Sequence, residues 1–361
     1  MDEMKEYREN LAEIDKKMAG LFEERMKLAR KEAEYRKENG LSVRDPKVEE
    51  KIISDNKDLI GDDDIRSYYV NFMKNTIDLS CDFQEQLLSG MKVAYSGVEG
   101  AFAYIAAKKM YPKARLISCP DFLSAYKMVE DGQADCAVLP MENSLAGEVG
   151  TVMDLMYSGS LFINQVLDLP IRHHLLGLPG STIDDIKTLV SHPQALNQCV
   201  KYTNKKGYDT RTAVNTAVAA KDAAKLNDKT VGVIASEEAA DLFGLIVLDH
   251  DIQDSEINST RFAAFSRSLN QMDPGIKREN ENFILVFTVK NEAGALASTL
   301  NIIGVHGYNM RSLKSRPMKD LQWNYYFYIE AEGNINTRNG KMMLQELSAL
   351  CGGLKLVGTY H

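Results

Sequence analysis

Residues 137–144 read Ala-Val-Leu-Pro-Met-Glu-Asn-Ser, an apolar run that ends in polar residues. A short apolar run of this length is typical of a strand buried in a sheet. In open α/β sheets, ligands bind beyond the ends of the strands. The stretch therefore predicts an α/β fold around it, with candidate binding residues in the Glu-Asn-Ser segment.

Two further polar clusters lie beside strand-like runs. Residues 191–194, Ser-His-Pro-Gln, come directly after the apolar residues 188–190, and Gln198 lies in the helix that should follow. Residues 258–262, Asn-Ser-Thr-Arg-Phe, precede another alternating run. Taken singly, each cluster is more often a helix cap or a turn, because these residue types favour such positions.

A glycine turn lies upstream of these clusters. The strand-like residues 92–95 run into Ser-Gly-Val-Glu-Gly at 96–100 and then into a helical pattern. The backbone N–H groups of such a turn can bind an anion. The turn is not the dinucleotide fingerprint GxGxxG, which argues against a nicotinamide cofactor.

Taken in order, these segments resemble the prephenate dehydratases. The resemblance covers residues 91–270 and also includes Asn-Thr-Ala at 215–217 and Ala-Ser-Glu at 235–237. It implies an α/β domain of two lobes, like the type II periplasmic binding proteins, with the active site in the cleft between the lobes. A prephenate dehydrogenase is disfavoured, because that activity needs the missing nicotinamide fingerprint.

The resemblance also implies roles for individual residues. Prephenate loses carbon dioxide and a ring hydroxyl, and the departing carboxylate supplies the electrons without a cofactor. The hydroxyl is a poor leaving group that needs a proton or a strong hydrogen bond. By resemblance Thr260 assists its departure, while Asn143, Ser191 and Gln198 position the substrate. Arg261 is either a carboxylate anchor or part of a structural salt bridge.

Two adjacent histidines, His173 and His174, receive no catalytic role. They alternate between faces if they lie in a strand. One of them is expected to be a hydrogen-bonded structural residue.

Residues 1–90 are charged, almost free of glycine and helical in period. A heptad seam in the first helix consists of Met4, Tyr7, Leu11, Ile14, Met18, Leu21 and Leu28. No helix breaker occurs before Asn39-Gly40, so the helix would be ~55 Å long at 1.5 Å per residue. It needs partner helices or a second chain to cover this seam. Pro46 starts a second predicted helix, and residues 62–64 precede a third.

Arg25 occupies an a position of the seam, and Arg36 lies ~16 Å further along the same face. Two such guanidinium groups can grip a small dianion, although a polar residue at an a position often only fixes register. With these residues the region resembles the all-helical chorismate mutases, intertwined dimers in which the partner chain supplies one arginine. The corresponding residues are Arg8, Arg25, Asp45, Glu49, Ser80 and Gln84.

The resemblance to the mutases implies a pocket that holds chorismate in a compact conformer. Arg8 and Arg25 would bind carboxylates, Asp45 and Glu49 would meet the ring hydroxyl, and Gln84 would donate to the breaking ether oxygen.

Two departures weaken this prediction. The family has lysine where this chain has Arg36, and arginine where it has Val48. The planar guanidinium group is a poor substitute for a point contact, and Val48 removes a cation. We therefore expect weak or absent mutase activity.

The C-terminal region, residues 281–361, reads as strand, helix, strand, strand, helix, strand, after a polar linker at residues 268–280. This order resembles the ACT regulatory domain. In that family Gly-Ala-Leu and Ser-Arg-Pro segments frame a phenylalanine site at a subunit interface. Here the segments are Gly294, Ala295 and Leu296, and Ser315, Arg316 and Pro317. A domain used only for dimerisation is the alternative, and Lys314 stands where the dehydratases commonly have an acidic residue.

Bulk composition limits the function classes. A net charge of −8 argues against nucleic acid or anionic membrane as a partner. No secretory h-region and no apolar run near ~20 residues is present. The five cysteines are scattered and no HExxH motif occurs, so we expect a cytoplasmic protein without a metal site or cofactor.

The sequence therefore predicts a multidomain enzyme of phenylalanine biosynthesis. The domains are an all-α chorismate mutase-like domain (1–90), an α/β two-lobed prephenate dehydratase domain (91–270) and an α+β ACT domain (281–361). We expect a homodimer or higher homo-oligomer, prephenate and possible chorismate as substrates, and feedback control by phenylalanine. The alternatives are a fully bifunctional enzyme and a catalytically silent amino-acid-binding regulatory protein.

Overall fold

The computed structural model describes residues 2–269, 281–318 and 324–361. The chain divides into two compact units at residues 92 and 93. The N-terminal unit consists of the helices α1 (Asp2–Asn39), α2 (Pro46–Lys57) and α3 (Asp63–Ser89). Their bounds agree with the predicted helices to within two residues.

Local signals in the sequence explain these helix bounds. The Asp45 carboxylate caps α2 by accepting from the backbone N–H groups of Lys47 and Val48, at 3.1 and 3.3 Å. Asp62 caps α3 in the same way. Gly90 follows α3 with a φ of 73°, a conformation that glycine adopts without strain.

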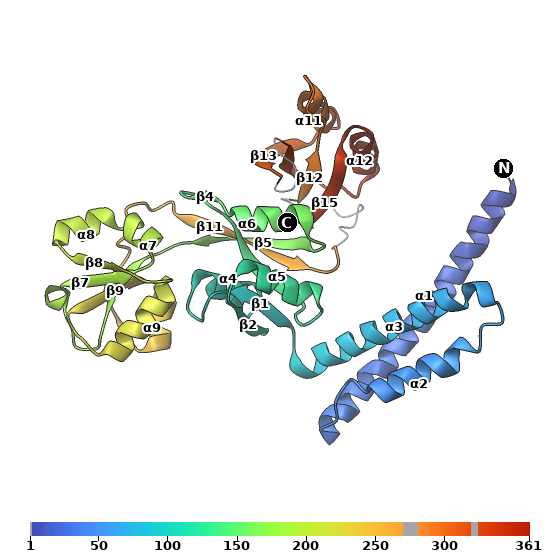
Figure 1. Ribbon diagram of the computed structural model, residues 1–361, viewed down its shortest axis with the longest axis horizontal. Coiled ribbons are helices and arrows are strands. Elements are labelled where there is room, and N and C mark those ends of the chain that lie inside the picture. Colours follow the sequence, from blue (N-terminus) through green and yellow to red (C-terminus); the bar gives the residue numbers. More distant parts are fainter. Residues whose placement is uncertain (1, 270–280, 319–323) are drawn as a thin grey trace. The chain divides into compact units, whose positions relative to one another are not determined.

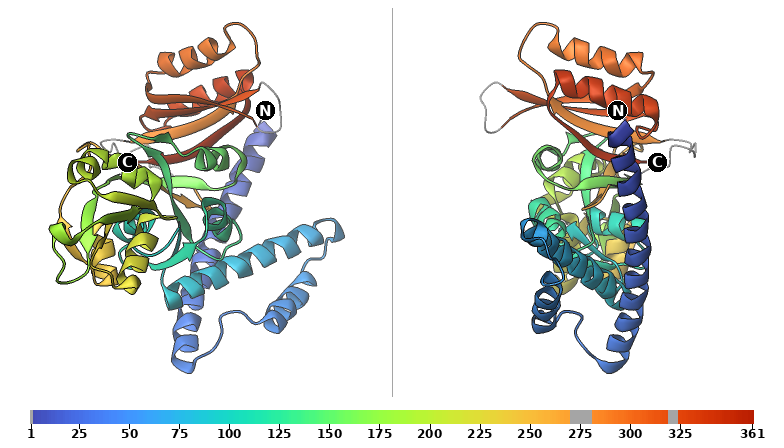
Figure 2. Two further views of the ribbon diagram at one scale, coloured as in Figure 1. Left: turned by 60° about the vertical axis from the view of Figure 1, so that its left-hand side comes forward. Right: turned by 90° about the vertical axis from the view of Figure 1, so that its right-hand side faces the viewer.

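The helical unit has a small core of its own. Val43, Ile77 and Cys81 form a buried cluster, and Ala29 and Ala33 are the buried residues of α1. The predicted heptad seam is not covered, since each of its seven apolar residues is between 45% and 65% exposed. Figure 2 shows α1 as one long continuous helix. This chain therefore leaves the apolar seam of α1 open.

The second unit begins with an α/β lobe. Its strands are β1 (Lys92–Ser96), β2 (Arg115–Cys119), β3 (Cys136–Asn143), β4 (Gly147–Glu148), β5 (Phe162–Pro170) and β11 (Ser259–Ser266). The order β5-β11-β3-β1-β2 makes β3 a central strand, and β11 pairs antiparallel with both β3 and β5. The helices are α4 (Phe102–Met110), α5 (Phe122–Glu130) and α6 (Gly150–Ser158).

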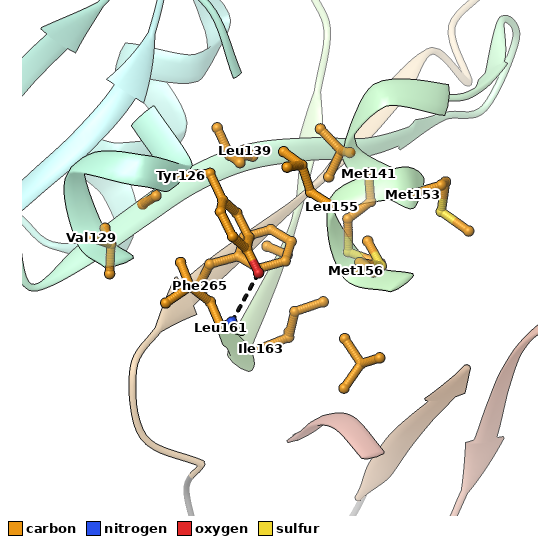
Figure 3. Close-up of a cluster of buried hydrophobic side chains, with 14 of the residues drawn as sticks. Tyr126, Val129, Leu139, Met141, Met153, Leu155, Met156, Leu161, Ile163 and Phe265 are labelled. Atoms are coloured by element: carbon orange, nitrogen blue, oxygen red, sulfur yellow. Dashed lines mark hydrogen bonds between the residues drawn. The ribbon is translucent and has the colours of Figure 1, made fainter. Parts of the chain in front are cut away.

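The apolar run of β3 is buried as predicted, and Ala137, Val138 and Leu139 have no exposed surface. Tyr126 packs edge-on against Phe265 with ring centroids 5.6 Å apart. The backbone N–H of Leu161 donates to the Tyr126 hydroxyl at 2.8 Å (Figure 3). This core anchors the strands that end at the candidate site.

A second lobe has its own sheet in the order β10-β6-β9-β7-β8. The strands are β6 (His174–Gly177), β7 (Thr188–Ser191), β8 (Asp209–Thr212), β9 (Val231–Ala235) and β10 (Ile246–Asp249). The helices are α7 (Pro193–Gln198), α8 (Val200–Lys206), α9 (Thr216–Leu226) and α10 (Glu237–Phe243), with a short 3₁₀ turn at Ile183–Asp185. The chain enters this lobe after β5 and returns through β11, so two segments join the lobes (Figure 1).

The C-terminal region has the predicted order of elements. It contains β12 (Asn282–Thr288), α11 (Ala295–Val305), β13 (Asn309–Pro317), β14 (Tyr325–Glu332), α12 (Arg338–Leu350) and β15 (Gly352–Tyr360). Its strands pair antiparallel in the order β13-β14-β12-β15. Most of the predicted linker, residues 270–280, and the predicted strand start at Trp323 lie outside the described residues.

Both faces of β12 are buried. Phe283, Leu285 and Phe287 face a core made with α11 and α12, which lie on one face of the sheet (Figure 2). Ile284 and Val286 face the core of the first lobe. The sheet continues into that lobe, where Gly358 of β15 pairs with Ile163 of β5. A Cβ atom at Gly358 would lie 2.2 Å from the Ile163 carbonyl oxygen, so only glycine permits this junction.

No helix in the described part of the chain is long and apolar enough to cross a membrane. All five cysteines are free thiols. Across residues 2–269, 281–318 and 324–361, no cluster of three histidine, cysteine or acidic side chains suits a metal ion.

Candidate active sites

A cavity of about 300 Å³ lies between the two lobes. Three of the predicted catalytic residues line it, namely Asn143 and Thr260 from the first lobe and Gln198 from the second. Its wall is otherwise apolar or neutral, and it includes Phe102 and Phe262. Asn143, Gln198 and Thr260 therefore line one cavity between the lobes, as expected from the sequence.

Strand register brings Asn143 and Thr260 together. The two residues are direct partners in the antiparallel pairing of β3 with β11. The Asn143 amide nitrogen donates to the Thr260 hydroxyl oxygen at 2.9 Å. The Asn143 amide oxygen accepts from the N–H groups of Leu145 and Ala146, which fixes the orientation of the amide. Because the Thr260 oxygen accepts this bond, its own hydrogen remains available to a ligand.

On the opposite wall, Gln198 is held by a histidine. The His173 Nε2 atom lies 2.9 Å from the Gln198 amide oxygen. An amide oxygen can only accept, so Nε2 carries the proton and the Gln198 amide nitrogen remains free to donate. Burial lowers the pKa of His173 and keeps the ring neutral. Its Nδ1 atom is buried and has no hydrogen-bond partner among the described residues.

His173 was not selected from the sequence as a functional residue, yet it lines the cavity. Its position at the first crossing between the lobes, just before β6, is the signal that could have identified it. The neighbouring His174 instead accepts from the Asp251 N–H at 3.1 Å, as expected of a structural histidine.

The structure does not place Ser191 on the cavity wall. Ser191 is the last residue of β7, and it is completely buried. Its hydroxyl donates to the Ile234 carbonyl oxygen of β9 at 2.6 Å. The prediction that Ser191 positions substrate directly is thus corrected, because its side chain points into the lobe. The next residue, His192, lines the cavity and caps α7.

Arg261 forms a structural salt bridge, one of its two predicted roles. Its guanidinium group binds the Glu330 carboxylate of β14 through two bonds of 2.8 and 3.0 Å. It also donates to the Tyr360 hydroxyl at 2.9 Å. Burial alone would raise the pKa of Glu330, but hydrogen bonds from Arg261 and Tyr360 lower it overall. The catalytic strand β11 is thereby tied to the C-terminal sheet.

The helical unit contains a second cavity, of about 430 Å³. All the predicted chorismate-binding residues except Arg8 line it, namely Arg25, Arg36, Asp45, Glu49, Ser80 and Gln84. Arg8 is exposed on α1, ~42 Å along the helix from Arg36. Its proposed delivery from a second chain remains a prediction.

Several polar groups of this cavity are already engaged. Arg25 donates to the Ser80 hydroxyl, and Arg36 donates to the backbone carbonyls of Ser42 and Val43. Asp45 caps α2, as described above. Val48 adds an apolar wall where the family has a cation.

Glu32 is a lining residue that sequence reasoning missed. Its carboxylate pairs with Arg36 at 2.7 Å and accepts from the Gln84 amide nitrogen at 3.1 Å. It lies seven residues after Arg25, at the next a position of the seam, and this spacing was the available signal. One of the two N–H groups of Gln84, the donor expected to stabilise the ether oxygen of chorismate, is therefore bound to a carboxylate.

Family models match both regions of the chain that contain these cavities. A chorismate mutase type II model matches residues 7–85, and a prephenate dehydratase model matches residues 93–270. The bifunctional chorismate mutase/prephenate dehydratase of Aquifex aeolicus is 30% identical over 365 residues, covering 100% of this chain and 98% of that protein. Arogenate dehydratase/prephenate dehydratase 1 of Arabidopsis thaliana is 32% identical, covering 75% of this chain and 72% of that protein.

A solved structure is similar to this chain over most of its length. The prephenate dehydratase of Arthrobacter aurescens in complex with L-Phe has a TM-score of 0.69 and 26% identity, over 75% of this chain and 89% of that chain. Relatives that match this chain over 98% or more of its length carry both activities in their names. This chain belongs to the family of bifunctional chorismate mutase/prephenate dehydratases.

Proposed function

We propose that Thr260 donates a hydrogen bond or proton to the departing ring hydroxyl of prephenate in the interlobe cavity. The observation that carries this assignment is the 2.9 Å bond from the Asn143 amide to the Thr260 oxygen. It occupies an acceptor site of that oxygen and leaves the hydroxyl hydrogen for the substrate. As the ring carboxylate leaves as carbon dioxide, its bonding electrons enter the ring. The hydroxyl leaves with one proton as water.

The cavity has no charged side chain among its lining residues, although prephenate is a dianion. Backbone dipoles supply the missing attraction in this proposal. The cavity is lined by Ala101 and Phe102 at the start of α4, and by Asn215 and Thr216 at the start of α9. Helix N-termini attract anions through free N–H groups and the helix dipole. Gln198 adds a side-chain donor, and the apolar wall suits the aromatic product.

A coupled assay tests the overall assignment. The purified protein is supplied first with prephenate and then with chorismate, and phenylpyruvate is measured. We expect rapid turnover of prephenate. A protein that binds prephenate without forming phenylpyruvate would instead be the silent binding protein considered above.

We propose reduced mutase activity for the helical unit. Val48 removes a cation, and Glu32 engages both Arg36 and Gln84. Turnover of chorismate near that of prephenate would favour the fully bifunctional alternative.

The open apolar seam of α1 supports a homodimer in which a second copy covers it and brings Arg8 to the pocket. The free thiols suit a cytoplasmic location.

We also propose that the C-terminal region is an ACT domain that inhibits the dehydratase when phenylalanine binds. The proposed effector residues lie in two places. Gly294, Ala295 and Leu296 start α11, and Leu296 lines a cavity of about 130 Å³. Ser315, Arg316 and Pro317 end β13.

The strand β13, which ends in the second of these segments, contacts the catalytic lobe. Lys314 pairs with Glu142 at 2.8 Å, and Glu142 directly precedes Asn143. Arg316 pairs with Glu148 and Asp154, each at 3.2 Å. A shift of β13 on effector binding would therefore move the strand end that holds Asn143. A dissociation constant of roughly 1 mM corresponds to weak binding. If 1 mM phenylalanine leaves prephenate turnover unchanged, the proposed feedback inhibition is absent.

A further inference from the structure

The cavity of the helical unit has the wrong charge for a dianion. Its lining contains two guanidinium groups, from Arg25 and Arg36, and three carboxylates, from Glu32, Asp45 and Glu49. A third arginine from a second copy of the chain would only balance the three carboxylates. A dianionic ligand such as chorismate requires an excess of positive charge around it, because its desolvation is otherwise uncompensated.

Two buried hydrogen-bond acceptors of this cavity are unpaired. The Glu49 Oε1 and Gln84 Oε1 atoms are buried and have no hydrogen-bond partner among the described residues. Buried polar atoms of this kind cost free energy unless a ligand or water satisfies them. On the donor side, one N–H of Gln84 is bound to Glu32, and Arg36 donates to Glu32 and to backbone carbonyls, whereas Arg25 has N–H groups beyond those given to Thr76 and Ser80 and can bind a carboxylate. The cavity therefore calls for a ligand that brings N–H donors.

The remaining positive and negative groups are spaced for a compact head group. Arg25 contacts Ser80, and Glu32 contacts Gln84, which is four residues further along α3. The two residues that they contact, Ser80 and Gln84, are about 6 Å apart along α3, roughly one turn of helix. A carboxylate and an ammonium group attached to the same carbon, as in an α-amino acid, can contact Arg25 and Glu32 respectively.

The rest of the lining is apolar. It consists of Leu28, Ala29, Val43, Val48, Ile52, Ile77 and Cys81. A volume of about 430 Å³ accommodates an aromatic side chain beside the head group.

We infer that the helical pocket binds a net-neutral aromatic α-amino acid, with its carboxylate at Arg25 and its ammonium group at Glu32, Glu49 and the Gln84 oxygen. Glu32 is the residue that determines this specificity. Its carboxylate pairs with Arg36, which reduces the positive charge available to a dianion, and it can accept a further hydrogen bond from an ammonium group. This site is separate from the proposed effector site in the C-terminal region, and it does not depend on that proposal.

Calorimetric titration of the full-length protein tests the inference, with L-phenylalanine and L-tyrosine as probes. The matched probe 3-phenylpropionate has the same ring and carboxylate as phenylalanine but lacks the ammonium group. We expect it to bind this pocket at least about 10-fold more weakly, the scale of one lost charge-assisted hydrogen bond. Equal affinity of phenylalanine and 3-phenylpropionate would overturn the inference.

The variant Glu32→Gln separates this site from the C-terminal one. We expect it to weaken amino-acid binding in the helical pocket by about 10-fold and to raise kcat/KM for chorismate. The matched control is Glu34→Gln, an exposed residue two positions further along α1, which should change neither quantity.

Inhibition of prephenate turnover by phenylalanine, measured on the same samples, reports on the C-terminal region. If that inhibition is absent in every sample, the proposed feedback control fails while the helical site can still be detected. If Glu32→Gln binds both amino acids as tightly as the unmodified protein does, the helical site is refuted whatever the inhibition.

Discussion

The interlobe cavity and the helical pocket differ in which hydrogen-bonding groups they leave free. In the interlobe cavity, Asn143 and His173 satisfy the acceptor sides of Thr260 and Gln198, so donors remain for the substrate. In the helical pocket, Glu32 accepts one N–H of Gln84, and the Gln84 and Glu49 side chains each keep an unpaired acceptor oxygen among the described residues. Both regions contain most of the residue types their families require. Their chemistry depends on what the neighbouring side chains have already bound.

The largest effect is expected at Thr260. Thr260→Ala removes the hydroxyl and should lower kcat for prephenate by ~10²-fold or more, while Thr260→Ser should retain most of the rate. Phenylpyruvate formation measures both. Thr212→Ala, on the exposed strand β8, is the control. Near-normal turnover by Thr260→Ala would show that the free hydroxyl donor of the interlobe cavity is not needed for the reaction. The proposed difference between the two cavities would then have no catalytic consequence.

The second effect concerns the scaffolds behind the two cavities. Glu330→Ala removes the buried carboxylate that binds Arg261, which keeps only the exposed Asp168 at 3.2 Å and the Tyr360 hydroxyl, and should cost about 3 kcal/mol of stability. Asp78→Asn breaks the more exposed pair with Arg44 in the helical unit and should cost less than about 1 kcal/mol. Urea denaturation of both variants measures the difference. Similar losses would mean that the Glu330 cluster is no stronger than a surface pair.

The stability that the Glu330 cluster contributes should decrease as the pH falls. The folded protein lowers the pKa of Glu330, so its stabilisation is complete above the unfolded value of about 4.3. It is lost as the pH falls through the lower folded pKa. The difference in stability between the unmodified protein and Glu330→Gln should therefore shrink only in acid.

The third prediction concerns a variant that restores a cation in the helical pocket at the position where the chorismate mutases have arginine. Val48→Arg adds a cation to its wall and should raise kcat/KM for chorismate by about 10-fold, the scale of one charge-assisted hydrogen bond. Chorismate consumption measures it, and Leu59→Arg on an exposed turn serves as the control. If Val48→Arg leaves kcat/KM for chorismate unchanged, the missing positive charge is not what limits the mutase reaction.

The smallest effect is expected from pH in the interlobe cavity. Burial lowers the pKa of His173, so the ring stays neutral down to pH values below its ordinary pKa of about 6.5. We expect kcat/KM for prephenate to be flat from pH 6.5 to 8 and to fall only in more acid solution. A profile that rises between pH 7 and 6 would mean that His173 acts as a cation.

Sequence patterns predicted the local features of this protein well. The bounds of α1 and α2 follow from Asn39-Gly40 and from Asp45-Pro46, because caps and breakers act within a few residues. The buried strand at residues 137–144 and the order of the C-terminal elements were also predictable. The pattern of apolar and polar residues within a few positions indicates a strand and the side of it that is buried. The resemblance to known families then selected Thr260 and Asn143, which lie at adjacent strand ends.

Other features depended on contacts between distant residues. Ser191 and His192 are neighbours in sequence, but the pleat of β7 buries the first and places the second in the cavity. Lys314 had no evident role until β13 brought it to Glu142. Glu32 and Gln84 meet across 52 residues through the packing of α1 on α3.

By itself, the sequence determined where the helices and strands lie, which families the chain resembles and which residue types occupy the two sites. Only the tertiary structure decided which of those side chains are free to act on a ligand. Caps, breakers and apolar periodicity act over one or two turns of chain. The partners of Thr260, Gln84 and Lys314 come from segments more than 50 residues away, and strand register and helix packing bring them together.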